Sequence, residues 1–278
     1  MNLSQLRFPG GKRHALTLSY DDGVEQDIRL MEILNTHGIR CTFNLNSGCF
    51  TPEGTVFAQD QIHRRLTRRA ALDLYGLSDH EIALHGYVHA DPTELSPEDC
   101  LREYQQDRQA LEDLFGRIIR GSAYAYGRYN EDVIAVLSAL DVVYARTVHS
   151  THAFAIPERF LELHPTCHHD DEKLFDLFDA FLTDTSEAPL LFYLWGHSYE
   201  FEQHDNWDRI NTFCRLAGGQ SSIYYCTNME LYDYVTAFRR LVVSLDQKRI
   251  YNPSAIELFF ARRDQILHID AGQTLILS

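Results

Sequence analysis

Two adjacent carboxylates follow a short apolar run. Residues 15–20 (ALTLSY) predict a buried strand, which ends in Asp21-Asp22-Gly23. Ligands of parallel α/β folds bind at the carboxyl ends of strands. Consecutive side chains there point in different directions, so one carboxylate can hold a metal while its neighbour faces a substrate. The alternative interpretation is an ordinary aspartate-rich turn, since Asp-Gly is common in turns.

Two histidines four residues apart follow a second predicted strand. Residues 81–84 precede His85-Gly-Tyr-Val-His89. On a helical turn, this spacing puts both imidazoles on one side. Two nitrogens can then approach one Zn²⁺ at about 2.0–2.1 Å. Two surface histidines in a loop are the alternative.

A third strand end carries another histidine. Trp195-Gly196-His197 follows the apolar run 190–195. Parallel strands would place this histidine at the same sheet edge as Asp21, Asp22, His85 and His89. Two histidines and one aspartate leave coordination positions open for water, as a catalytic zinc site requires.

Four segments resemble, in order and separation, the motifs of the polysaccharide deacetylases (carbohydrate esterase family 4, with its NodB-like homology domain). Ser19–Gly23 resembles the first motif, T-F-D-D-G, and His85–His89 resembles the second, H-[S/T]-x-x-H. Tyr124–Gly127 is similar to the third, P-Y-G, and Leu194–His197 to the last, a hydrophobic residue shortly before a catalytic histidine. The resemblance covers residues 13–240.

The resemblance implies one divalent metal ion bound by Asp22, His85 and His89. Zn²⁺ is the expected ion, and Co²⁺, Ni²⁺ and Fe²⁺ also suit this ligand set. The resemblance further implies that Asp21 is the general base that deprotonates metal-bound water. The backbone N–H of Tyr126 would help to hold the oxyanion, which is worth about 2.7–4 kcal/mol.

The last role implied by the resemblance belongs to His197, which would protonate the leaving amine. Three family features are missing: Ala125 stands in place of the usual proline, the arginine of the third motif has no secure match, and the fourth motif, D-x-x-D-W, is not visible. Arg146 and the segment 164–169 either supply the missing arginine and acceptor contacts or line a substrate wall.

Several other histidine, acidic and basic residues could belong to a site or to an ordinary surface. Neighbouring His168 and His169 are not expected to bind one ion together. Glu200 and the basic cluster 64–69 are expected on solvated surfaces. The candidate substrate-binding residues are Tyr87, Trp195, His168 and Arg146.

Strands and helices alternate about seven times, which indicates a parallel sheet. With the resemblance, we expect a distorted (β/α)7 barrel over residues 1–241. A small β extension over residues 242–278 is expected to pack on it. The strands are predicted at 15–20, 41–45, 81–84, 117–120, 142–146, 190–195 and 223–226. The helices are predicted at 25–35, 64–75, 97–115, 131–140, 171–182, 207–216 and 229–241.

The net charge of the chain limits the classes of molecule that it is expected to bind. The 278 residues carry 25 Lys+Arg and 40 Asp+Glu, a net charge of −15. Such a field repels phosphate backbones and anionic lipid, so neither nucleic acid nor a membrane is an expected partner. The start of the chain lacks the apolar core of a signal peptide, and no apolar run is long enough to span a bilayer. A cytoplasmic location and reduced, mostly buried cysteines are therefore expected.

The predicted activity is metal-dependent hydrolysis of an N-acetyl group from an amino sugar, an oligosaccharide or a sugar conjugate. The expected cytoplasmic location favours a soluble intracellular substrate. One alternative is hydrolysis of a non-sugar amide of the cyclic ureide type. Another is a barrel that binds metal and carbohydrate without turnover. Oligomeric state is left open by the sequence.

Overall fold

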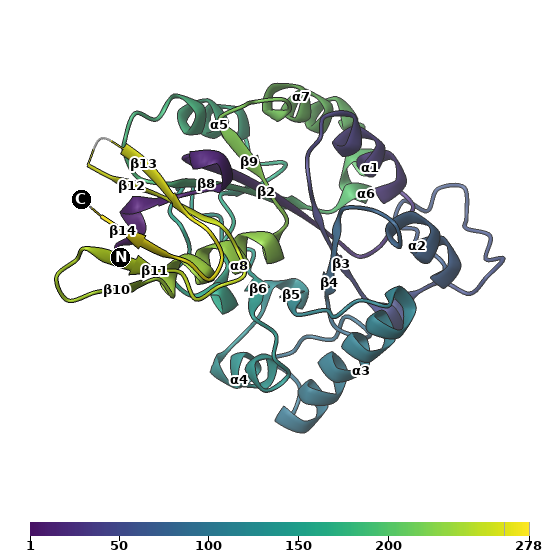
Figure 1. Ribbon diagram of the computed structural model, residues 1–278. Coiled ribbons are helices and arrows are strands. Elements are labelled where there is room, and N and C mark those ends of the chain that lie inside the picture. The colour runs from purple at the N-terminus through teal and green to yellow at the C-terminus, as the bar shows by residue number, and fades with distance from the viewer. Residues whose placement is uncertain (264, 278) are drawn as a thin grey trace.

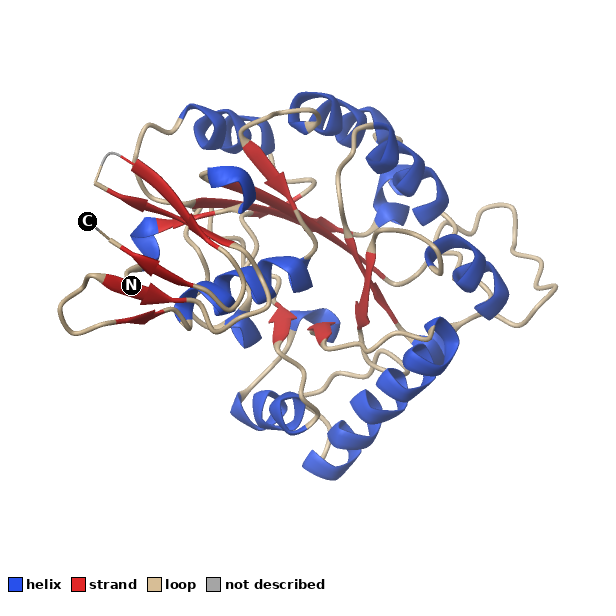
Figure 2. Cartoon of the chain, viewed as in Figure 1, coloured by secondary structure: helices blue, strands red, loops and turns tan. Residues whose placement is uncertain are grey.

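One curved parallel sheet forms the centre of the computed structural model, which describes residues 1–263 and 265–277. Helices flank the sheet (Figures 1 and 2). The sheet strands are β2 (His14–Asp21), β3 (Thr42–Leu45), β4 (Glu81–Leu84), β5 (Gly121–Ala123), β6 (Tyr144–Arg146), β7 (Cys167–His168), β8 (Leu190–Gly196) and β9 (Ile223–Tyr225).

The strand order is β6-β5-β4-β3-β2-β8-β7, and β9 pairs with the first half of β2. Each pairing in this sheet is parallel. The ends of the sheet, β6 and β7, do not pair with each other in the described part of the chain; near them, only a single bridge joins Arg146 to Leu163. The sheet is therefore an incompletely closed barrel, which confirms the predicted distorted (β/α)7 fold.

The helices begin and end largely where local signals predict. For α3, the Ser96 side chain accepts a hydrogen bond from the backbone of Asp99, Pro97 is the first residue, and Gly116 ends the helix at φ +64°. The α-helices are α1 (Asp27–Thr36), α2 (Arg68–Tyr75), α3 (Pro97–Phe115), α4 (Glu131–Ala139), α5 (Leu174–Thr183), α6 (Ser198–Gln203), α7 (Trp207–Ala217) and α8 (Asn228–Arg239). Short 3-10 helices are η1 (Leu3–Gln5), η2 (Pro9–Gly11), η3 (Ser47–Cys49), η4 (Ala125–Gly127) and η5 (Phe160–Glu162).

The prediction of a strand at residues 117–120 is wrong. Pairing begins instead at Gly121, in the segment Gly-Ser-Ala, whose small residues carry little strand signal. Gly121 is needed there because a Cβ atom would lie 2.1 Å from the Tyr144 hydroxyl on β6. Two further elements, α6 and β7, were not predicted, and α2 begins at Arg68 rather than at residue 64.

The chain also forms two small antiparallel sheets, and strands from both ends of the chain pair in one of them (Figure 1). One has the order β1-β12-β13 and the other β10-β11-β14. Their strands are β1 (Leu6–Arg7), β10 (Val242–Val243), β11 (Arg249–Tyr251), β12 (Leu258–Arg262), β13 (Gln265–Ile269) and β14 (Thr274–Ile276). The division at residue 241 stays a prediction, since the pairing of β1 with β12 joins the two ends of the chain.

Successive side chains of β2 point to opposite faces of the sheet and therefore pack in two different core clusters. Leu16, Leu18 and Tyr20 belong to a core cluster shared with the flanking helices. Ala15 belongs to a second cluster, which also contains residues of α8 and of β1 and β12. Ser19, on the same side of the strand as Ala15, lies 2.9 Å from the Tyr193 hydroxyl of β8. Because side chains alternate along a strand, Asp21 also lies on this interior side, at the carboxyl end.

The cysteines and the apolar content of the helices were also subjects of prediction from the sequence. Five of the six cysteines are buried free thiols, and Cys49 is partly exposed. Among the described residues, no helix is both long and apolar enough to cross a membrane.

Candidate active site

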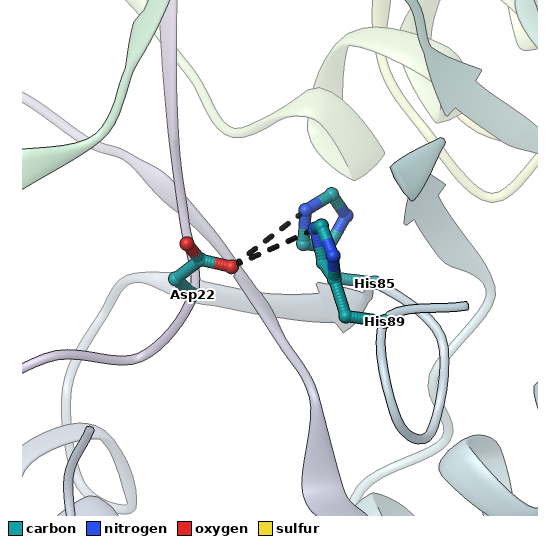
Figure 3. Close-up of side chains that lie close together, drawn as sticks. All are labelled: Asp22, His85 and His89. Atoms are coloured by element: carbon teal, nitrogen blue, oxygen red, sulfur yellow. Dashed lines mark ion pairs between the residues drawn. The ribbon is translucent and has the colours of Figure 1, made fainter. Parts of the chain in front are cut away.

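Asp22, His85 and His89 meet at the carboxyl end of the sheet, as predicted. Figure 3 shows one oxygen of Asp22 directed at both imidazoles. Asp22 Oδ1 lies 3.9 Å from His85 Nε2 and 3.9 Å from His89 Nε2. One carboxylate oxygen and two imidazole nitrogens thus converge on a common space.

The backbone that presents these ligands is partly left-handed. Asp22 has φ +87° and His89 has φ +58°, values that non-glycine residues seldom adopt. The backbone N–H of Asp22 donates to Asn44 O on β3 at 2.9 Å, which fixes the turn just beyond β2. Backbone strain of this kind costs of order 1–3 kcal/mol per residue and persists only where surrounding contacts hold it.

His85 has a defined tautomer. Its Nδ1 lies 2.9 Å from the carbonyl oxygen of Ala123 on β5. A carbonyl can only accept, so Nδ1 carries the proton and Nε2 presents a lone pair toward Asp22. Burial lowers the pKa of His85 despite the opposing carboxylates Asp21 and Asp22. Burial and neighbouring His85 also lower the pKa of His89, to about 4. Both imidazoles are therefore neutral near pH 7, as metal ligation requires.

Asp22 is held by a loop that sequence reasoning assigned to a solvated surface. Arg65 Nη2 lies 3.0 Å from Asp22 Oδ1, and His63 Nε2 lies 3.1 Å from Oδ2. Arg65 also donates to the backbone carbonyl of Asp22 at 2.6 Å. Burial would raise the pKa of Asp22, but the His63 hydrogen bond and the Arg65 charge hold it well below its usual range. The prediction of a solvated basic face is thus wrong for Arg65.

Asp21 is enclosed by hydrogen-bond donors. Asn44 Nδ2 donates to Asp21 Oδ1 at 2.8 Å, and Arg146 Nη2 contacts Oδ2. The Asp21 side chain is only 2% exposed. Burial would raise its pKa, but the Arg146 guanidinium, followed by the imidazoles of His85 and His197, holds the pKa below its usual range. Asp21 is accordingly an ionised, oriented acceptor.

His197 lies on the other side of Asp21. Its Nε2 is 3.8 Å from Asp21 Oδ2, and its Nδ1 is 3.2 Å from Glu200 Oε2. The backbone N–H of His197 donates to the same Glu200 oxygen at 3.1 Å, which caps α6. Burial would lower the pKa of His197, but Glu200 and then Asp21 raise it. The site therefore combines neutral imidazoles at Asp22 with one imidazole that favours the protonated form.

Tyr126 and Tyr87 flank the histidines. Tyr126 lies in the turn after β5 at φ +56°, is 62% exposed, and has its ring 4.5 Å from that of His89. The role of its backbone N–H stays a prediction. Tyr87, between the two histidines in sequence, packs closely over Gly48, where a Cβ would lie 2.6 Å from the Tyr87 carbonyl oxygen.

Of the three other candidates, Trp195 and Arg146 are buried and His168 is partly exposed. Trp195 is 8% exposed and Arg146 is 1% exposed. The Arg146 guanidinium lies 4.2 Å from the Trp195 ring centre, and the His168 ring meets the same indole at 4.7 Å. Arg146 thus supplies the arginine contact to Asp21, one of the two interpretations left open by the sequence. Direct substrate contact by Arg146, Trp195 or His168 stays a prediction.

Two neighbouring histidines of the segment 167–169 face one carboxylate. His168 Nε2 and His169 Nε2 lie 3.2 Å and 3.3 Å from Glu200 Oε2, so the neighbouring imidazoles do converge. Glu200, assigned by sequence to a solvated loop, is therefore part of the site. A signal was present in the sequence: His197 and Glu200 have the spacing of an N-cap and its third helical residue. The contacts of Asn44 and His63 had no comparable local signal.

Comparison with known proteins agrees with the geometry. Residues 9–145 match the polysaccharide deacetylase family model. Over these residues the chain is similar to the polysaccharide deacetylases. A search of curated proteins gives no match. The family match includes Asp21, Asp22, His85, His89 and Tyr126, but it ends before Arg146 and His197.

Several solved structures are similar to this chain at low sequence identity. A candidate polysaccharide deacetylase from Mycobacterium smegmatis is 15% identical, with a TM-score of 0.61, over 84% of this chain and 94% of that chain. A Streptococcus pyogenes deacetylase in complex with acetate is 19% identical, with a TM-score of 0.45, over 52% of this chain and 61% of that one. A carbohydrate esterase family 4 pseudoenzyme from Bacillus anthracis is 16% identical, with a TM-score of 0.47, over 81% and 66% of the two chains.

The residues present fit a divalent metal ion. The ligand atoms of Asp22, His85 and His89 all lie within 4.8 Å of one another. The Ala123 carbonyl orients His85 as an outer-shell partner should, and neutral imidazoles with one carboxylate are ligand types that zinc accepts.

Proposed function

We propose that this chain is a metal-dependent hydrolase that removes an N-acetyl group from an amino sugar, an oligosaccharide or a sugar conjugate. One observation carries the proposal. The buried carboxylate of Asp21 lies between the presumptive metal ligands and His197, 3.6 Å from His85 Nε2 and 3.8 Å from His197 Nε2. A base, an acid and a metal site thus share one sheet edge.

The metal would be held by Asp22, His85 and His89. When bound there, a divalent ion supplies Lewis acidity, which polarises an acyl carbonyl and makes water more acidic. Arg65 and His63 hold the carboxylate of Asp22, and the Ala123 carbonyl holds His85. Zinc is our choice of ion because two imidazoles and one carboxylate recur in catalytic zinc sites.

Asp21 acts as the general base. It takes the proton of the attacking water, while Arg146 and Asn44 keep its two oxygens oriented. Those contacts also favour the ionised form, so the carboxylate is ready to accept a proton at neutral pH. A metal-binding barrel without turnover would have no need of this second, separately held carboxylate.

His197 acts as the general acid. An amide nitrogen leaves poorly unless it is protonated, and a positioned acid is worth about 10²- to 10⁴-fold in rate. Glu200 stabilises the imidazolium and leaves Nε2 directed toward Asp21. Tyr126, in the exposed turn after β5, would place a backbone N–H near the developing oxyanion.

Acid release from a substrate panel tests the proposal. The panel contains N-acetylglucosamine, short chitooligosaccharides, nucleotide-linked N-acetyl sugars and cyclic amides, each assayed with and without Zn²⁺ or Co²⁺. Asp21→Asn should reduce turnover by at least 10²-fold and retain the metal. Asp176→Asn, the same change at an exposed position on α5, is the matched control.

The outcomes separate the candidate functions. Metal-dependent acetate release from a sugar, lost in Asp21→Asn and kept in Asp176→Asn, supports the proposal. Turnover of cyclic amides alone would move the activity to the ureide type. Metal and carbohydrate binding without release of any product would favour a binding protein.

A further inference from the structure

A single oxygen of Glu200 joins two histidines of different strands. Glu200 Oε2 lies 3.2 Å from His197 Nδ1, after β8, and 3.2 Å from His168 Nε2, at the end of β7. The rings of His168 and His197 are 6.4 Å apart, so His168 reaches His197 through the carboxylate. His168 is also outside the contacts that hold Asp21.

The backbone fixes which nitrogen of His168 carries a proton. The N–H of Asp170 donates to His168 Nδ1 at 3.2 Å. Because a nitrogen that accepts a hydrogen bond has a free lone pair, the proton of the neutral ring is on Nε2. The protonated Nε2 of His168 therefore faces Glu200 Oε2 at 3.2 Å, and its edge contact with Trp195 at 4.7 Å restricts the ring.

We propose that His168 is a positioning residue for His197 and acts through the carboxylate of Glu200. This inference rests on the proposed hydrolase function. A glutamate side chain has three rotatable bonds, and its terminal torsion is broad. The backbone N–H of His197 donates to Oε2 at 3.1 Å, and the Nε2 of His168 approaches the same oxygen at 3.2 Å. Together these contacts place Oε2 3.2 Å from His197 Nδ1. The imidazole is then held with Nε2 toward Asp21.

A second cation site is the competing interpretation of the same groups. His168, His169 and Glu200 offer three ligand atoms within 4.8 Å of one another, and His169 is buried with neither ring nitrogen hydrogen-bonded. However, a metal on His168 Nε2 would require the proton to move to Nδ1, where the Asp170 N–H already donates. The hydrogen-bond geometry therefore favours the positioning role.

Two substitutions separate donation from mere packing. His168→Leu removes the donor, whereas His168→Gln keeps an amide N–H₂ near the place of Nε2. His268→Leu, at an exposed position on β13, is the control for loss of an imidazole. All variants are purified as the full chain and analysed for metal content, kcat, KM and the nuclear magnetic resonance signal of the His197 Nδ1 proton.

We expect His168→Leu to lower kcat by about 10-fold, with KM and metal content unchanged. The Nδ1 proton signal of His197 should broaden or disappear in His168→Leu and persist in His168→Gln, which should also recover most of kcat. Unchanged kcat and an unchanged signal in His168→Leu would overturn the proposal. So would a second equivalent of bound metal that His168→Leu removes.

The test does not depend on finding the substrate. If no panel compound turns over, the result counts against the proposed hydrolase function on these substrates. The Nδ1 proton signal still reports whether His168 positions His197. If acetate is released but His168→Leu behaves as the wild type, only the positioning role fails.

Discussion

At the scale of single residues, the surroundings of the histidines in the site shift their pKa values in opposite directions. His85 and His89 are kept neutral by burial, whereas Glu200 and Asp21 favour the protonated form of His197. Imidazoles of opposite tendency in one site indicate different roles, here ligand and acid. The backbone carbonyl of Ala123, which is hydrogen-bonded to His85 Nδ1, and the carboxylate of Glu200, 3.2 Å from His197 Nδ1, make this distinction.

Removal of either predicted histidine ligand tests the metal site. We expect His85→Ala or His89→Ala to lower metal affinity by at least about 100-fold, because two remaining ligands cannot complete a stable site. Metal content after dialysis and titration calorimetry with Zn²⁺ measure the effect. His37→Ala, distant in sequence from the motifs, is the control. Full metal occupancy in His85→Ala would show that the ion binds elsewhere.

At the scale of elements, the strand ends decide what the site contains. Asp22 follows β2, and His85 and His89 follow β4. Tyr126 follows β5, Arg146 ends β6, His168 ends β7, and His197 follows β8. Between β3 and α2, a loop brings His63 and Arg65 back to Asp22. Side-chain caps begin α2, α3, α4 and α8, whereas α1, α5 and α7 begin without one.

The cap of α3 gives a prediction at this scale. Ser96→Ala should lower the free energy of unfolding by about 1 kcal/mol, because the Asp99 N–H loses its side-chain acceptor. Urea unfolding followed by circular dichroism measures the change. Ser138→Ala, at an exposed position in α4, removes a hydroxyl without removing a cap. Equal stability of the two variants would contradict the role of Ser96.

At the scale of the whole molecule, Asp27 ties together segments far apart in the chain. Its carboxyl accepts hydrogen bonds from the Tyr75 hydroxyl on α2 and the Ser198 hydroxyl on α6, both at 2.6 Å. The backbone N–H of Val24 also donates to it. Burial raises the pKa of Asp27 to about 7 from an ordinary value of 3.8.

The contribution of Asp27 to stability should therefore fall as pH rises from about 4 to about 7. Over this range the unfolded chain has lost the Asp27 proton while the folded chain still binds it, so each rise in pH favours unfolding. Asp107 and Glu81, whose pKa values burial also raises to about 7, act in the same direction, whereas His80 and His89, whose pKa values burial lowers to about 4, act in the opposite one. Asp27→Asn removes the Asp27 contribution alone, so its stability should change less unfavourably from pH 5 to pH 7 than that of the wild type. Urea midpoints at pH 5 and pH 7, in metal-free buffer, test this. Identical pH dependence in Asp27→Asn and wild type would refute the assignment.

The sequence by itself determined the alternation of strands and helices, the order of the motifs and the core of the site. Each depends on local physics: apolar runs form buried strands, caps delimit helices, and Asp21, Asp22, His85 and His89 follow strands directly in the chain. Residues 117–120 mark a limit of this reasoning. There, β5 begins at Gly121 because a side chain at this position would overlap the Tyr144 hydroxyl, and local strand propensity does not encode such a contact.

Only the tertiary structure decided which distant groups support that core. Arg146 reaches Asp21 across 125 residues, and Arg65 reaches Asp22 across 43 residues. Charged residues such as Arg65 and Glu200 appear solvated in a sequence because exposure is their usual state. Their burial depends on which opposite charge the folded barrel brings within hydrogen-bond distance, and that distance is set by strand order and loop path.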